Sequence, residues 1–184
     1  YIIRDLINQG ACIDAFGVGE RLITSKSEPV FGGVYKLAAI EDAEGNVIPK
    51  IKVSENPSKV TTPHFKKVWR IFEQESDKAI ADLITVYDEP MDETKPLELF
   101  DPDAVWKRET VERYRAEELL RSIFKSGELV YDLPDIETIR AYCARQIERQ
   151  WDEVKRFENP HNYYVDLSQK LWDIKADLLQ QAKA

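Results

Sequence analysis

Two glycines, Gly17 and Gly19, form the part of the sequence that is best suited to chemistry. They follow a short apolar run, Cys12–Phe16, which only Asp14 interrupts and which has the pattern of a strand buried on both faces. Glu20–Ile23 can begin a short helix directly after the turn. Free N–H groups at a helix start carry partial positive charge, and glycine lets a phosphoryl oxygen approach the backbone closely. The pattern is therefore compatible with a phosphate-binding turn.

The glycine spacing alone does not identify a ligand, and an ordinary turn at the end of a strand is the alternative. A dinucleotide-binding fingerprint requires a third glycine at the position of Leu22, and no strand–helix–strand unit with an acidic residue follows. A Walker-type loop requires Gly-Lys-Ser or Gly-Lys-Thr, which the sequence lacks. Phosphate binding and a purely structural turn both stay open at this point.

The two histidines and two cysteines form no recognisable metal or catalytic motif. His64 and His161 lie far apart in the sequence and outside any H-x-x-x-H or H-E-x-x-H pattern, so we expect surface or capping residues. Cys12 and Cys143 are too few for a disulfide framework, and we expect buried, reduced thiols. The sequence therefore predicts no metal site made of protein ligands.

The segments before the glycine turn indicate one step of an α/β barrel. Apolar residues within Tyr1–Gln9 have the spacing of one helix face, and Gly10 can end that helix with a positive φ. A helix, a glycine and a buried strand in succession are typical of an α/β barrel. Because the chain starts inside the helix, we expect the preceding strand of the barrel to be missing and one strand edge to be exposed.

Two pairs of extended runs predict antiparallel hairpins. Val34–Ile40 and Val47–Val53 flank one polar turn, and Phe65–Glu73 and Ala79–Tyr87 alternate on either side of another. Lys36 lies in the first run, where it either contacts a phosphate or extends to solvent.

The second half of the chain is predicted to contain a linker and two helices. Asp88–Pro102 has three prolines and six acidic residues, the composition of a linker. Apolar residues at steps of three and four predict a helix over Asp135–Phe157, with Arg149 on a solvated ion-pair face. Asp166 is the predicted cap of a final helix. We expect both helices to cover apolar surface and to supply no chemistry.

Composition favours a globular protein of one domain, or parts of two. The 184 residues are 43% hydrophobic, and 34 acidic against 26 basic residues give a net charge of −8. Such a field disfavours nucleic acid and anionic membranes as partners. No apolar run approaches the ~20 residues that a bilayer span needs, and no signal peptide is visible, so the cytoplasm is the expected compartment.

Several ordered sequence blocks resemble the carboxyl-terminal part of nicotinate phosphoribosyltransferase. They cover essentially the whole chain: Phe16-Gly17-Val18-Gly19, Gly32–Leu37, Lys52–Thr61, Leu119–Pro134 and Asn159–Ser168. Ordered blocks of this kind are far more specific than a single G-x-G.

The resemblance implies an α/β fold class, with the late part of a type II phosphoribosyltransferase α/β barrel plus strands and helices of a smaller α/β domain. We expect residues 1–40 to end the barrel and to carry the phosphate-binding turn. Residues 41–100 would form antiparallel hairpins of the smaller domain and a linker, and residues 101–184 a carboxyl-terminal helical region.

The resemblance also implies an activity for the complete enzyme. Enzymes of this family join nicotinate to phosphoribosyl pyrophosphate, with ATP hydrolysis, and form nicotinate mononucleotide for NAD biosynthesis. The implied partners are these three small molecules, with Mg²⁺ to neutralise the leaving pyrophosphate, in a cytoplasmic homodimer. A phosphorylated histidine and the groups that hold nicotinate are expected upstream, so we expect no turnover by these 184 residues alone.

Carried over by position, the resemblance places the substrate phosphate at Gly17, Gly19, Glu20 and Arg21, with Val18 and Lys36 as further candidates. Glu20 departs from the family pattern, where threonine is common. Because a carboxylate repels phosphate, Glu20 would turn its side chain outward and donate only its N–H.

Two other functions compete with this interpretation. The segment could be a non-catalytic cap or subunit-interaction domain that uses its hairpins and helices to bind a partner. It could also belong to a sister phosphoribosyltransferase that uses nicotinamide or quinolinate, because the residues that select the base are expected outside this chain.

Overall fold

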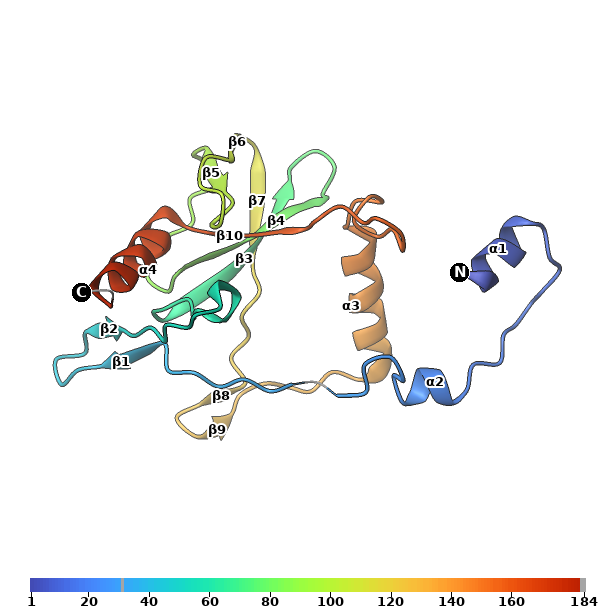
Figure 1. Ribbon diagram of the computed structural model, residues 1–184, viewed down its shortest axis with the longest axis horizontal. Coiled ribbons are helices and arrows are strands. Elements are labelled where there is room, and N and C mark those ends of the chain that lie inside the picture. The colour runs from blue at the N-terminus through green and yellow to red at the C-terminus, as the bar shows by residue number, and fades with distance from the viewer. Residues whose placement is uncertain (31, 183–184) are drawn as a thin grey trace. The chain divides into compact units, whose positions relative to one another are not determined.

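The computed structural model describes residues 1–30 and 32–182 and divides the chain into two compact units, Tyr1–Tyr35 and Lys36–Ala184 (Figure 1). The first unit contains the short helices α1 (Ile2–Asn8) and α2 (Glu20–Ile23). The predicted helix at the amino terminus is confirmed, and Gly10 follows it with φ of +79°. Its amide donates to Ile7 O at 2.9 Å, which closes the helix end.

The buried strand predicted for Cys12–Phe16 is wrong in this structure. The run has no regular secondary structure, and Ile13 and Phe16 are 37% and 43% exposed. A strand requires a hydrogen-bonded neighbour, and no strand within the described residues pairs with this run. The run therefore has the apolar pattern of a buried strand but no neighbouring strand that would bury it. The α/β barrel stays a prediction.

A four-stranded sheet organises the second unit, in the order β10-β4-β3-β7. Its strands are β3 (Lys66–Glu73), β4 (Ala79–Val86), β7 (Tyr114–Glu118) and β10 (Tyr164–Leu167). β3 pairs antiparallel with both β4 and β7, which confirms the predicted hairpin, while β10 adds to β4 in parallel. The sheet therefore joins segments from the middle and the end of the unit.

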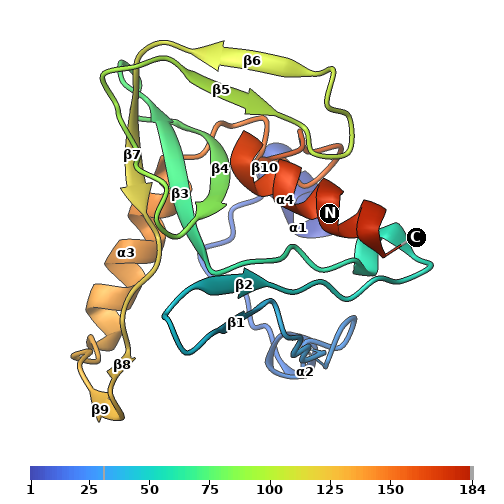
Figure 2. The ribbon, with the colours of Figure 1, turned by 90° about the vertical axis from the view of Figure 1, so that its left-hand side faces the viewer.

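Both faces of this sheet are covered, because side chains alternate along its strands. On one face, Ile71, Ala81 and Leu83 form a core with Leu99 and Tyr114. On the other face, a second core joins the sheet to α4 (Gln169–Gln181) through Val86, Leu167 and Leu171. Figure 2 shows α4 lying along the β4–β10 side of the sheet and the β5–β6 hairpin beside it.

The linker predicted for Asp88–Pro102 is wrong, because this segment packs onto the sheet. β5 (Leu97–Phe100) pairs antiparallel with β6 (Arg108–Val111), and Leu99 and Phe100 are only 4% and 2% exposed. Tyr114 also donates its hydroxyl to Asp92 O at 2.9 Å. The acidic and proline composition therefore belongs to the outer residues of a folded segment.

Two small hairpins lie outside the main sheet. β1 (Ala39–Glu41) pairs with β2 (Val47–Pro49), which confirms the first predicted hairpin over a shorter length. β8 (Phe124–Lys125) pairs with β9 (Glu128–Leu129), and a short 3₁₀ helix, η1, spans Pro57–Lys59.

Helix α3 (Ile136–Glu148) begins where predicted and ends earlier. Asp135 caps it by accepting a hydrogen bond from Thr138 N at 2.7 Å. At its other end, Lys78 Nζ donates to Glu148 O at 2.6 Å and Ala79 N donates to Arg149 O at 2.8 Å. The β3–β4 hairpin thus takes up the last carbonyl groups and ends the helix before the predicted limit.

Three further expectations are corrected. No residue of α3 is buried, so this helix does not cover apolar surface in the described unit. Asp166 lies in β10, and Ser168 caps α4 by accepting from Leu171 N at 3.3 Å. Cys12 and Cys143 are free thiols, and both are exposed, because neither the run nor the helix that carries them is covered.

Within the described residues, no helix has both the length and the apolar character to cross a membrane.

Replacing Leu171 by Ala should lower the free energy of unfolding by about 2–5 kcal/mol, because it empties a fully buried site between α4 and the sheet. The matched control is Leu133→Ala, where the leucine is 80% exposed and the change should stay below about 0.5 kcal/mol. Urea denaturation followed by circular dichroism measures both variants. Equal effects would show that α4 does not pack on the sheet.

Candidate functional site

The glycine turn of the first unit has the unsatisfied amides that phosphate binding requires. Gly19 is the N-cap of α2, and its carbonyl accepts from Leu22 N at 3.0 Å and Ile23 N at 3.4 Å. The amides of residues 17–21 donate to no described residue. The turn therefore leaves a set of adjacent backbone donors available.

Neither glycine of the turn is required by local packing. A Cβ built at Gly17 or Gly19 meets nothing within 4 Å, and neither residue has a positive φ. Val18 between them is 53% exposed. The surroundings of the turn are therefore open on the side where a ligand would approach.

Two cations follow the turn in the sequence and line one hollow of the first unit. Arg21 lines a hollow of about 370 Å³ together with Lys26 and Ser27. An arginine, a lysine and a hydroxyl are groups that commonly contact phosphate oxygens. Arg21 was a predicted site residue, whereas Lys26 and Ser27 were not, although both stand in the polar loop that follows the turn.

The structure keeps the contiguous residues Gly17–Arg21 together and assigns Lys36 to the second unit. There, Lys36 Nζ donates to Lys59 O at 3.0 Å. The contact of Lys36 with a phosphate therefore stays a prediction, as do the ligand contacts of the turn itself.

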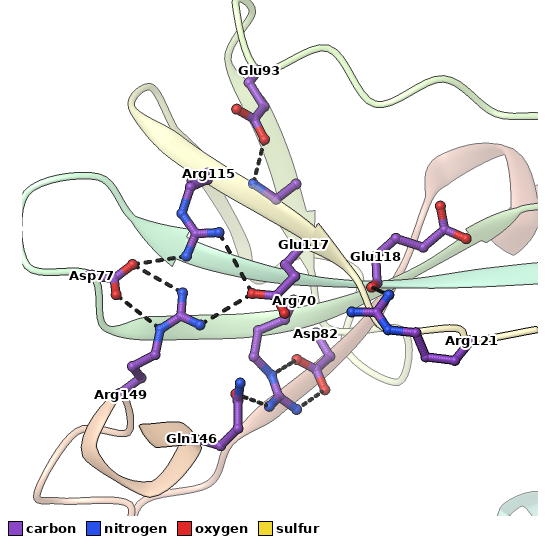
Figure 3. A network of polar contacts seen from close by, with 11 residues as sticks. Arg70, Asp77, Asp82, Glu93, Arg115, Glu117, Glu118, Arg121, Gln146 and Arg149 are labelled. Carbon is purple, nitrogen blue, oxygen red and sulfur yellow. Dashed lines mark hydrogen bonds and ion pairs between the residues drawn. The ribbon is translucent and has the colours of Figure 1, made fainter. Parts of the chain in front are cut away.

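A buried ion pair at the centre of the second unit was not predicted from the sequence. Arg70 forms two hydrogen bonds to Asp82, from Nε to Oδ1 at 2.8 Å and from Nη2 to Oδ2 at 2.9 Å (Figure 3). The two side chains are 19% and 13% exposed. Tyr163 donates its hydroxyl to Asp82 Oδ1 at 2.8 Å, and Gln146 Oε1 accepts from Arg70 Nη1 at 3.2 Å.

These contacts raise the pKa values of Arg70 and Tyr163. The hydrogen bond to Asp82 raises the pKa of Arg70, and burial raises the pKa of Tyr163, with Asp82 adding to the effect. Both groups therefore keep their protons at any physiological pH. A network whose donors and acceptors are paired in this way can hold strands and a helix in place, but it has no group free for proton transfer.

A second arginine network joins the end of α3 to the sheet. Arg149 donates from Nη2 to Asp77 Oδ1 at 3.0 Å and from Nη1 to Glu117 Oε2 at 3.2 Å. Arg115 also donates to Asp77, at 2.9 Å (Figure 3). The Arg149 guanidinium lies 3.4 Å from the centroid of the Phe72 ring. Arg149 is only 18% exposed, so its assignment to a solvated face of the helix was wrong.

Asp166 is the carboxyl group in the described part of the second unit whose pKa burial shifts upward. It is 4% exposed, and its Oδ1 has no hydrogen-bond partner. Burial raises its pKa to about 6, and the nearby carboxylates of Asp101 and Glu109 add to the shift. Sequence analysis predicted only a capping role for Asp166, because local pattern does not indicate that it lies in strand β10.

No cluster of three or more histidine, cysteine, aspartate or glutamate residues that could hold a metal ion is present in residues 1–30 and 32–182. His64 and His161 contact local backbone, with Phe65 N donating to His64 Nδ1 at 3.0 Å and His161 N donating to Glu153 O at 3.0 Å.

Comparison with known proteins identifies relatives over nearly the whole chain. Residues 65–175 match the family model of the nicotinate phosphoribosyltransferase C-terminal domain. The chain is 40% identical over 184 residues to nicotinate phosphoribosyltransferase of Bacillus subtilis, covering 100% of this chain and 37% of the relative. It is 29% identical over 167 residues to the Homo sapiens enzyme, covering 90% and 30%.

A solved structure supports the same relationship. The crystal structure of human nicotinic acid phosphoribosyltransferase matches with a TM-score of 0.60 and 25% identity, over 65% of this chain and 24% of that chain. The mixed α/β fold class is thus confirmed. The chain spans little more than a third of the length of the bacterial relative and less than a third of the human one.

Replacing Arg70 by Met should lower the free energy of unfolding by about 3 kcal/mol, because it leaves the Asp82 carboxylate buried without its cation. Arg140→Met is the matched control, since Arg140 and Glu137 form an ion pair in which both side chains are 73% exposed. That loss should cost less than about 0.5 kcal/mol. Chemical denaturation compares the two variants, and similar values for both would contradict a structural role for the buried pair.

Asp166→Asn tests the charge of the buried carboxyl group through the pH dependence of stability. The folded chain holds the Asp166 proton with a pKa of about 6, above the ordinary value of 3.8, so ionisation destabilises it. The unfolding free energy of the wild type, measured relative to Asp166→Asn, should therefore fall by about 2 kcal/mol between pH 4 and pH 7. A difference that does not change with pH would mean that the group is not perturbed.

Proposed function

The chain belongs to the nicotinate phosphoribosyltransferase family, and we propose that it forms the carboxyl-terminal part of an enzyme that makes nicotinate mononucleotide from nicotinate and phosphoribosyl pyrophosphate. The match of residues 65–175 to the C-terminal domain of this family carries the proposal. We further propose that ATP hydrolysis drives the reaction, that it serves NAD biosynthesis, and that the complete enzyme is a cytoplasmic homodimer.

In the proposed reaction, the ring nitrogen of nicotinate attacks the anomeric carbon of the ribose. The bond between that carbon and the pyrophosphate oxygen breaks, and pyrophosphate leaves with the bonding electron pair. The transition state resembles an oxocarbenium ion, with little help from covalent catalysis. The rate therefore depends on how firmly the sugar is fixed between nucleophile and leaving group.

The proposed contribution of this chain is to hold the 5'-phosphate of the sugar. The amides of Gly17, Gly19 and Glu20 have no acceptor among the described residues, and Arg21 adds a cation beside the same turn. A charge-assisted hydrogen bond contributes about 1.5–3 kcal/mol, so several amides would position the sugar strongly. Val18 and Lys36 are further candidates for contact.

Glu20 fits this proposal only in one orientation. Its carboxylate would repel a phosphate, but the residue is exposed at the start of α2, so its side chain can turn toward solvent. Its backbone N–H then remains available as a donor.

Mg²⁺ would accompany the substrate in this reaction, but the described residues of this chain do not form a site for it. The donor set lacks a group of carboxylates that could hold the ion. We assign no step to Mg²⁺ through the residues of this chain.

The second candidate function is a non-catalytic cap or subunit-interaction domain. The observation that favours it is the uncovered apolar side of α3, where Ile136, Ile139 and Ile147 are 66%, 48% and 53% exposed. Exposed apolar residues grouped on one element are typical of an interaction surface. Under either function, we propose that residues 1–184 alone have no turnover, and that residues elsewhere in the enzyme select nicotinate over nicotinamide or quinolinate.

Gly19→Val in the full-length enzyme should weaken binding of phosphoribosyl pyrophosphate by about tenfold or more, because the valine side chain hinders the close approach of a phosphate oxygen to the backbone amides, and one lost charge-assisted contact costs at least about 1.4 kcal/mol. The new side chain meets no described atom within 4 Å, so the fold should not prevent the test. Isothermal titration calorimetry measures the affinity, and circular dichroism checks the fold.

The matched control is Ala43→Val, which introduces the same side chain in the turn of the β1–β2 hairpin and should leave the affinity unchanged. Equal affinities of Gly19→Val and the wild type would remove the turn from the phosphate site and would favour the interaction-domain alternative.

A further inference from the structure

A pocket lies on the sheet face that the β5–β6 hairpin covers, at the β10 edge. It has a volume of about 210 Å³ and is lined by residues of β4, β5, β6 and β10 and by the segment between β5 and β6. Asp166 and Tyr164 line it together, because alternate residues of β10 point to the same face. Ala81, Leu99 and Phe100 give it an apolar wall.

The charges around this pocket are not balanced. Lys107 pairs with Asp101 at 3.6 Å, and Arg108 pairs with Glu98 and donates to Gln169 Oε1 at 3.2 Å. These contacts engage both cations that line the pocket. Asp166 and Glu109 have no ion pair with any residue in the described ranges. Two carboxylates therefore face the pocket without a cation, and one of them is almost completely buried.

Burying a carboxylate without a hydrogen-bond partner or a cation costs free energy. A buried carboxylate that lacks a partner within the protein therefore points to a bound molecule that supplies the contact. Asp166 Oδ1 is buried and has no hydrogen-bond partner among the described residues, and Asp166 lines the pocket. A compact ammonium group can donate to one oxygen, whereas a guanidinium group favours both oxygens of a carboxylate. The apolar wall suits an alkyl chain that carries the ammonium group.

We propose that this pocket binds a protonated primary amine, whose ammonium group donates a hydrogen bond to Asp166 and is attracted by Glu109. Nicotinate, phosphoribosyl pyrophosphate and ATP are anions that these carboxylates would repel, so this site is distinct from the one that the proposed function requires. The amine comes either from a free small molecule or from a lysine side chain of a polypeptide.

The proposed site should respond to pH. Asp101, Glu109, Lys107 and Arg108 are the charged groups that line the pocket with Asp166, whose pKa of about 6 is raised by burial and by Asp101 and Glu109. An alkyl amine stays protonated throughout this range, because its pKa lies near 10. Affinity should therefore rise about tenfold from pH 5 to pH 7.5, as Asp166 ionises.

The test is a titration of the 184-residue chain with n-butylammonium chloride, followed by two-dimensional amide NMR at constant ionic strength. We expect saturable shifts in Tyr164–Leu167 and Arg108–Val111, which Asp166→Asn weakens at least tenfold. Glu112→Gln is the matched control, because Glu112 lies on the same side of the unit but outside the pocket lining, and it should bind as the wild type does. Pentan-1-ol, a neutral probe of similar size, should not bind.

A parallel titration with N-acetyl-lysine methylamide distinguishes the two sources of the amine. Tighter binding of this probe than of butylammonium assigns the pocket to a lysine side chain, and the reverse assigns it to a small amine. Shifts that persist unchanged in Asp166→Asn, or the absence of saturable shifts from both amines, would overturn the proposal. A pKa of Asp166 below 4, measured by carboxyl NMR without ligand, would also overturn the proposal. Such a value would mean that Lys107 or another internal cation already forms an ion pair with the carboxylate.

Discussion

The antiparallel pairing of β3 with β4 is the constraint on which the second unit depends. Its register places Arg70 directly opposite Asp82, so the two charges in the middle of these strands neutralise each other. The same pairing directs Ile71, Ala81 and Leu83 to one face and Ile84 and Val86 to the other. A slip by one residue would exchange these faces and leave both charges among apolar neighbours. The ion pair therefore acts as a marker of the correct register as well as a contact.

The hairpin also determines what surrounds it. Its turn residues Asp77 and Lys78 hold Arg149 and the last carbonyl groups of α3, so the tip of the hairpin fixes the end of a helix far away in the sequence. Its two faces receive the β5–β6 hairpin and α4 in separate cores. The polar groups at the centre are engaged with one another, which makes the second unit a scaffold. Among the groups without a hydrogen-bond partner are the amides of the glycine turn in the first unit and Asp166 Oδ1 in the second.

The sequence predicts the parts of the fold that depend on local pattern. The alternation of Phe65–Glu73 and Ala79–Tyr87 gives the central hairpin, and Asp135 with its threonine partner gives the start of α3. The sequence does not reveal contacts between distant segments: the capping of α3 by Lys78, the covering of the sheet by Leu99, or the parallel addition of β10. Local pattern can also predict burial that does not occur. Ile13 and Phe16 belong to a run with the pattern of a buried strand, but both are exposed because no described strand pairs with that run. Arg70 and Asp82 each lie between apolar residues in the sequence. Once the register of the hairpin is known, these two positions predict an ion pair. The Asp166 pocket had no such signal, because it exists only where four strands meet.

The parallel strand β10 carries a consequence for how the chain acquires its structure. Asp82 and its partner Tyr163 are separated by 81 residues, so this edge of β4 has no neighbour until nearly the whole unit has been synthesised. Closing so long a loop is entropically costly, and contacts at this separation form late and slowly. On a ribosome, the central hairpin can assemble early, while its β4 edge stays open until Tyr164–Leu167 have been synthesised. During that interval the open edge is a template for pairing with other nascent chains, and the addition of β10 removes this template.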